Sequence, residues 1–144
     1  MDTLMMMTVS APPTETSAQI LGRISSQVEQ LGDNDNWPPR LVYLVNLTLE
    51  ELGLNALTHG REHGLDELSM TIRASSDSIV IEMSDNGAPF DPLMDAPIPD
   101  LDAPLEARPV GGLGIYLIRK MVDEAHYRRT NRRNCLTLIT RRDQ

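Results

Sequence analysis

Three polar residues recur at four-residue intervals within LEELGLNALTHG, residues 49–60: Glu51, Asn55 and His59. In a helix this spacing places them along one stripe. An Asn side-chain oxygen suits the octahedral shell of Mg²⁺. A Glu one turn earlier could orient or deprotonate a hydroxyl or water that attacks a phosphate. Taken alone, the stripe also fits a polar seam on the surface or between helices.

Two further stretches carry polar or backbone groups suited to a nucleotide. Asp85 opens DNGAPF directly after a strand-like run, and its carboxylate could accept a hydrogen bond from an exocyclic amine such as that of adenine. Gly111 to Gly114, GGLG, enter a helical pattern, where free N–H groups favour phosphate. Each stretch alone is also an ordinary turn or helix entry. The sequence has neither a P-loop nor G-x-G-x-x-G, which disfavours those nucleotide folds.

Hydrophobic periodicity predicts the elements that position these residues. Apolar residues at helical spacing predict one helix from Thr14 to Leu31, capped by Thr14 or Thr16 and ended by Gly32. A second helix is expected from Pro38 or Pro39 to Gly60, and a third in GGLGIYLIRKMVDEA. Strands are expected in MMMTVS, an edge strand, in 68–74 and 78–84, and in AHYRRT and CLTLITR around the turn NRRN. This order predicts an α+β two-layer sandwich, with helices on one face of a mainly antiparallel sheet.

Composition fits one soluble domain of 144 residues, with 40% hydrophobic residues and only 3% aromatic ones. The single cysteine, Cys135, excludes an internal disulfide or a cysteine-based metal cluster. No signal-like or membrane-spanning segment is visible, so we expect the cytoplasm.

The formal charge is unevenly distributed. Residues 1–118 carry 5 basic and 18 acidic residues, a balance of −13, and residues 119–144 carry 8 and 3, a balance of +5. The acidic bulk would repel a phosphate backbone, which argues against nucleic-acid binding. We expect the C-terminal arginines to form strand ends and a partner-facing rim; they are Arg128, Arg129, Arg132, Arg133, Arg141 and Arg142.

The three motifs, in this order, resemble those of the GHKL ATPase superfamily with its Bergerat, or histidine-kinase-like, fold. Glu51 to Ala56 resembles the N box, Asp85 to Gly87 the G1 box, and Gly111 to Gly114 the G2 box. LEELGLNALTHG, DNGAPFDP and GGLGIYLIRKMVDEA are also similar to the RsbW-like anti-sigma-factor kinases.

The resemblance implies a role for each motif residue. Glu51 would be the catalytic base, Asn55 the Mg²⁺ ligand, and His59 a neighbour of the phosphates. Asp85 would bind the adenine amine, and Gly87 would let the base approach the backbone. The phosphate pocket would be bounded by Gly111, Gly112, Leu113 and Gly114. Glu50 is about 100° around the helix from Glu51 and is expected to face elsewhere.

The proline-rich, acidic residues 91–110 would form a mobile ATP lid. Arg108 is its only basic residue. It could reach the γ-phosphate, with Arg119 and Lys120 as alternatives.

The implied protein is one ATP-binding kinase domain over residues 1–144, in which 1–13 are an N-terminal strand and linker. As a cytoplasmic homodimer it would bind MgATP, phosphorylate a STAS-domain anti-anti-sigma factor and sequester a sigma factor, without nucleic acid or membrane partners. The alternative is a nucleotide-dependent binding switch of the same fold without kinase activity. The catalytic domain of a histidine kinase is disfavoured, because no dimerising phosphoacceptor helix pair is found.

Overall fold

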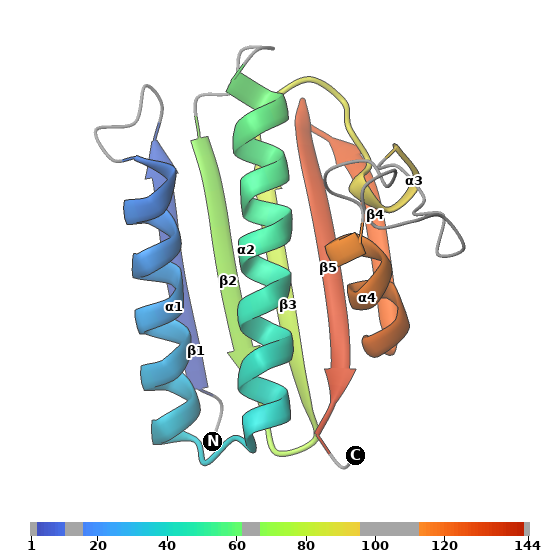
Figure 1. The fold of residues 1–144 in the computed structure, drawn as a ribbon. Coiled ribbons are helices and arrows are strands. Elements are labelled where there is room, and N and C mark those ends of the chain that lie inside the picture. Colours follow the sequence, from blue (N-terminus) through green and yellow to red (C-terminus); the bar gives the residue numbers. More distant parts are fainter. Residues whose placement is uncertain (1–2, 11–15, 62–66, 96–112, 143–144) are drawn as a thin grey trace, which may run out of the picture.

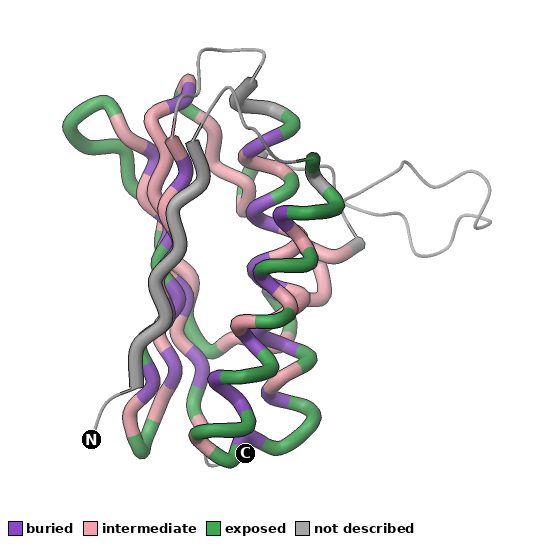
Figure 2. The backbone as a smooth tube through the Cα atoms, turned by 90° about the vertical axis from the view of Figure 1, so that its left-hand side faces the viewer, coloured by how far each residue is buried: buried purple, intermediate pink, exposed green. Residues whose placement is uncertain are grey.

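In the part of the chain that the structure describes, one sheet is covered on one face by helices (Figures 1 and 2). The structure, a computed structural model, describes residues 3–10, 16–61, 67–95 and 113–142. Five strands form the sheet in the order β1-β2-β3-β5-β4, and every pairing between them is antiparallel. The predicted α+β two-layer architecture is therefore confirmed.

The sheet brings the end of β3 beside the start of β5. Its strands are β1 (Thr3–Ser10), β2 (Glu67–Ala74), β3 (Ser78–Asp85), β4 (Glu124–Thr130) and β5 (Arg133–Arg141). The register places Asp85 opposite Asn134, and Asn134 opposite Arg129. As predicted, the first strand lies at an edge.

Within the described ranges four helices accompany the sheet, and two of the predicted boundaries were wrong. They are α1 (Ser17–Asn34), α2 (Pro39–Arg61), the short α3 (Pro92–Asp95) and α4 (Leu113–Met121). Thr16 caps α1 through a capping box with Gln19, so the predicted Thr cap is confirmed.

Gly32 does not end the first helix. A Cβ at this position would lie 2.9 Å from Val42 Cγ2 and 3.3 Å from Trp37 Cε3. The glycine therefore serves close packing inside α1, which continues to Asn34.

The third helix is shorter than predicted because its last residues join the sheet. It ends at Met121, and the backbone N–H of Asp123 donates to the Ile139 carbonyl at 2.9 Å. Within the predicted loop 91–110, residues 92–95 form α3, whereas residues 96–112 lie outside the described ranges.

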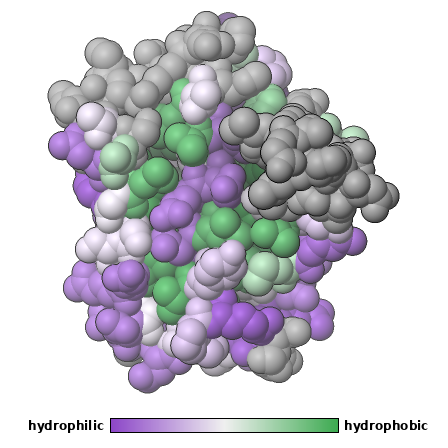
Figure 3. Space-filling model, viewed as in Figure 1, coloured by the Kyte–Doolittle hydropathy of each residue, from purple (hydrophilic) through white to green (hydrophobic). Residues whose placement is uncertain are grey.

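The core lies between the sheet and the helix layer, because the buried positions alternate along β2 and β3. Ile20, Ile24 and Val28 of α1 meet this face and are at most 1% exposed. On the outer side of α2, Tyr43 and Leu54 stay exposed, and Figure 3 shows hydrophobic residues gathered over the middle of this face. No helix in the described part of the chain is long and apolar enough to cross a membrane.

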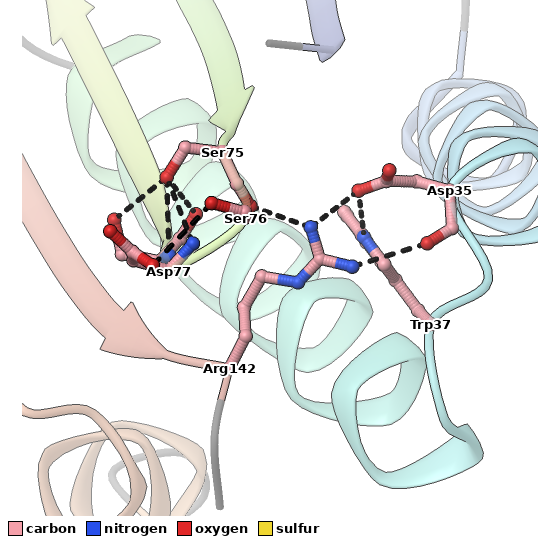
Figure 4. Close-up of polar contacts among 7 residues, drawn as sticks. Asp35, Trp37, Ser75, Ser76, Asp77 and Arg142 are labelled. Carbon is pink, nitrogen blue, oxygen red and sulfur yellow. Dashed lines mark hydrogen bonds and ion pairs between the residues drawn. The ribbon is translucent and has the colours of Figure 1, made fainter. Parts of the chain in front are cut away.

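A guanidinium group joins three distant segments at one end of the sheet (Figure 4). Arg142 Nη1 donates to Asp35 Oδ2 at 2.7 Å and to the Ser75 carbonyl at 2.6 Å. Its Nη2 donates to the Asp35 carbonyl at 3.1 Å, and Trp37 Nε1 donates to Asp35 Oδ2 at 2.9 Å. The C-terminal strand is thereby tied to the α1–α2 connection and to the β2–β3 turn.

Candidate functional site

A pocket open to solvent lies between α2 and the β3–β5–β4 side of the sheet. Apolar side chains form most of its wall, and Asn55, Asp85, Tyr127 and Asn134 supply side-chain polar groups. The apolar lining residues are Leu52, Ala56, Met83, Ala88, Phe90, Pro92 and Leu136.

The polar stripe of α2 reaches this region, as the four-residue spacing predicts. Asn55 is half-buried and lines the pocket. Glu51, one turn earlier and also half-buried, lies against the start of α4. The backbone of His59 belongs to α2, and its side chain lies outside the described part of the structure.

Gly114 of the glycine-rich motif lies very close to the Glu51 side chain of α2. A Cβ added to Gly114 would lie 2.5 Å from Glu51 Cγ and 2.6 Å from Glu51 Oε2. Real Cβ atoms do not tolerate such distances, so α4 can begin at this position only with glycine or after Glu51 moves. Gly111 and Gly112, and the side chain of Leu113, lie outside the described residues.

Asp85 ends β3 and fixes the turn that follows it. Its Oδ1 accepts a hydrogen bond from the Gly87 N–H at 2.9 Å, which is an Asx turn. The Asn86 side chain accepts from the Glu67 N–H at 3.0 Å and ties the turn to β2. Gly87 is buried, and its carbonyl accepts from Arg129 Nη1 at 2.6 Å. The D-x-G motif is thus held by Glu67 of β2 and by Arg129 of β4.

Asn134 and Tyr127 line the same pocket, and sequence reasoning missed both. Asn134 Nδ2 donates to Asp85 Oδ1 at 3.0 Å, and Tyr127 donates from its hydroxyl to Asn134 Oδ1 at 2.5 Å. A signal for Asn134 was present. The alternation of β5 places residue 134 on the same face as buried Leu136 and Leu138, so a polar residue there needs polar partners.

The C-terminal arginines divide into two groups. Arg129, Arg133 and Arg142 make hydrogen bonds within the domain. Arg128, Arg132 and Arg141 are exposed, as expected for strand ends.

The two cations of α4 are engaged outside the pocket. Arg119 Nη1 donates to the Leu93 carbonyl at 2.5 Å, and Lys120 Nζ lies 5.5 Å from the centre of the Tyr116 ring. Arg108 lies outside the described residues.

Burial raises the pKa of two groups near the site. It raises the pKa of the Glu50 carboxyl, and the neighbouring Glu51 raises it further. Burial also raises the pKa of Tyr127, because it disfavours the charged phenolate. Tyr127 therefore remains a neutral hydroxyl donor at neutral pH.

The residues present fit a nucleotide with a divalent cation. No group of three or more His, Cys, Asp or Glu side chains that could hold a metal occurs among the described residues. Mg²⁺ needs no such cage, because it binds through one or two protein oxygens together with phosphates and water. Asn55 supplies an amide oxygen on the pocket wall, and within the described ranges that amide has no hydrogen-bond partner.

Comparison with known proteins agrees with this arrangement. The profile of the histidine kinase-like ATPase domain matches residues 15–140. The serine/threonine-protein kinase BtrW of Bordetella bronchiseptica is 30% identical over 114 residues, which cover 78% of this chain and 80% of BtrW. The profile match spans α1, α2, the pocket-lining residues and all but the last residue of β5. The chain belongs to the histidine kinase-like ATPase domain family of the GHKL superfamily.

Proposed function

We propose that the protein is a protein serine/threonine kinase of the RsbW-like, partner-switching type. It binds MgATP, transfers the γ-phosphate to a Ser or Thr of a STAS-domain anti-anti-sigma factor, and binds a sigma factor when that antagonist does not hold it. The likeness to BtrW over most of both chains carries the proposal. Two observations support it: Asn55 and Asp85 line one pocket, and Glu51, one helical turn before Asn55, lies against Gly114 of the glycine-rich motif. We further propose that residues 1–144 act as one domain, as a cytoplasmic homodimer.

In this proposal each site residue has one task. Asp85 accepts a hydrogen bond from the adenine amine, and the apolar pocket wall packs against the base. Asn55 holds Mg²⁺, which when bound neutralises charge on the phosphates. His59 and the segment from Gly111 to Gly114 border the phosphates. Gly87 leaves room for the base beside the backbone.

Glu51 acts on the protein substrate. It accepts the proton of the Ser or Thr hydroxyl while that oxygen bonds to the γ-phosphorus and the bond to the ADP leaving oxygen breaks. The proton ends on the Glu51 carboxylate and ADP departs.

The test is phosphoryl transfer from γ-labelled MgATP to purified STAS-domain proteins of the same organism. Wild type should label one of them on Ser or Thr, and Glu51→Ala should lower the rate at least about 100-fold. Glu50→Gln is the matched control, since it changes the neighbouring carboxyl and should transfer as wild type does. Absence of label with every STAS protein of that organism, while MgATP is bound, would contradict the kinase.

A second function, a nucleotide-dependent binding switch without transfer, is favoured by one observation. Arg119 and Lys120 are engaged with Leu93 and Tyr116, so neither is directed to the pocket. Under this alternative, MgATP would change sigma-factor binding equally in wild type and in Glu51→Ala. Pull-down of the sigma factor with and without nucleotide separates the two functions.

A further inference from the structure

Asn134 uses every hydrogen-bonding position of its side-chain amide. The residue is 7% exposed. Its Nδ2 donates to Asp85 Oδ1 at 3.0 Å and to the Ala88 carbonyl at 2.8 Å. Its Oδ1 accepts from the Phe90 N–H at 3.1 Å and from the Tyr127 hydroxyl at 2.5 Å. An amide offers two donor hydrogens and two acceptor lone pairs, so none is left over.

This arrangement allows one orientation of the amide. Turned over, its NH₂ would face the Phe90 N–H and its oxygen would face the Ala88 carbonyl and the Asp85 carboxylate. All three contacts would be repulsive, and a buried polar group without a partner is costly. Asn134 is therefore a fixed donor toward Asp85.

The two carboxylate oxygens of Asp85 differ in their hydrogen bonds. Oδ1 is occupied by two donors, the Gly87 N–H at 2.9 Å and Asn134 Nδ2 at 3.0 Å. Within the described ranges no group donates to Oδ2, although Asp85 lines the pocket. Oδ2 is thus the carboxylate oxygen that remains to accept a hydrogen bond from a ligand.

We propose that Asn134 is a positioning residue that sets the base specificity of the pocket: it holds Asp85 so that Oδ2 receives an amino group of the purine and rejects an oxo group. Adenine carries the amino group at the position where guanine carries an oxygen. A guanine oxygen would face a carboxylate oxygen with no proton between them, and such mismatches discriminate strongly. The inference rests on nucleotide binding in this pocket, as the proposed function does, but not on phosphoryl transfer.

Tyr127 helps to hold the Asn134 amide, so changing it should affect base discrimination more weakly than changing Asn134 itself. Its hydroxyl is one of two donors to Asn134 Oδ1, and the Phe90 N–H is the other. Removing the hydroxyl alone leaves the pocket wall in place and loosens the amide without removing it. Tyr127→Phe should therefore weaken base discrimination less than Asn134→Ala does.

The experiment measures the dissociation constants of ATP and GTP directly, by calorimetry on the purified full chain. The variants are Asn134→Ala and Tyr127→Phe. Thr140→Val is the control, because Thr140 is buried on the same face of β5 and lies outside the pocket. We expect the ratio of GTP to ATP dissociation constants to fall at least tenfold in Asn134→Ala and by a smaller factor in Tyr127→Phe. The ratio should be unchanged in Thr140→Val, even if that variant melts at a lower temperature.

Each other outcome is decisive. If the variants weaken ATP and GTP equally, or leave the ratio at the wild-type value, Asn134 only stabilises the fold. A wild type that binds ATP and GTP alike also overturns the inference and leaves the kinase proposal standing. A wild type that prefers ATP but transfers no phosphate overturns the kinase alone, and one that binds neither nucleotide overturns both.

Discussion

Gly114, the first residue after Leu113 in α4, lies so close to Glu51 of α2 that a Cβ at residue 114 would come within 2.6 Å of Glu51 Oε2. Two motifs separated by about 60 residues of sequence are therefore in direct contact. The side chain proposed to take the hydroxyl proton is confined by the start of α4, the segment that we propose to border the phosphates.

Replacing this glycine should disturb Glu51 before it disturbs the fold. In Gly114→Ala the new methyl group displaces the Glu51 side chain, and we expect phosphoryl transfer to fall at least about tenfold, since general base catalysis depends on placement. The measurement is the transfer rate at saturating MgATP. Gly22→Ala is the control, because a Cβ there meets nothing within 4 Å and alanine favours a helix by up to about 1 kcal/mol. Equal rates in both variants would mean that the contact has no part in transfer.

Asn55 should matter for the metal and not for folding, because its amide has no hydrogen-bond partner among the described residues. Asn55→Ala should bind ATP in the presence of Mg²⁺ only as tightly as it does after chelation, and should melt close to the wild-type temperature. Titration of MgATP with and without a chelator measures this. The neighbouring exposed residue gives the control Leu54→Ala, which should keep the Mg²⁺ effect. If Asn55→Ala also keeps it, Mg²⁺ is held elsewhere.

Replacing Glu50 by Gln should raise the stability of the folded protein at neutral pH but not at acidic pH. Folding raises the pKa of its carboxyl above the ordinary value of 4.5, so the folded state binds more protons and this residue's contribution to stability falls as pH rises from 4.5 through the folded pKa. Glu50→Gln has no ionisable group at this position, so its stability does not fall with rising pH on this account. We expect the variant to melt above wild type at pH 7 and the difference to disappear below pH 4.5. Thermal melts from pH 4 to pH 8 measure it, and a difference that is constant over this range would contradict the shift.

Removing the Arg142 side chain, which lies outside the pocket, should lower the stability of the fold. Its side chain is 17% exposed and that of Asp35 is 24% exposed, so removal of the guanidinium leaves a half-buried carboxylate and two carbonyls without this donor. Arg142→Ala should lower the free energy of unfolding by about 1–3 kcal/mol. The exposed neighbour gives the control Arg141→Ala, which should change it by less than about 0.5 kcal/mol. ATP affinity should be unaltered in both, as measured on folded protein.

The layers could be predicted from the sequence because local patterns decide them. Alternation fixed which residues of β2 and β3 face the helices, and the capping signal at Thr16 was read correctly. The error at Gly32 has a tertiary cause, since that glycine admits Val42 and Trp37 against the helix. The error at the end of α4 has a similar cause, because pairing with Ile139 draws Asp123 toward the sheet.

The site was predicted only where motifs carried it. Glu51, Asn55 and Asp85 belong to recognisable stretches; the structure places Asn55 and Asp85 on one pocket wall and Glu51 against Gly114. Asn134 and Tyr127 act through the pairing of β3, β5 and β4, which no local spacing reveals. Likewise, the carbonyl that receives Arg129 lies 42 positions earlier in the chain.

The Arg142 contacts have a consequence for how the chain folds during synthesis. Asp35, Ser75 and Arg142 belong to the first, middle and last parts of the sequence, and β5 pairs with both β3 and β4. Until β5 leaves the ribosome, β3 is paired with β2 alone, and its other edge is open to other nascent chains. Emergence of residue 142 then joins the helix connection to the hairpin turn. A chain stalled before that point is expected to depend on chaperones, although its first helices and hairpin are already complete.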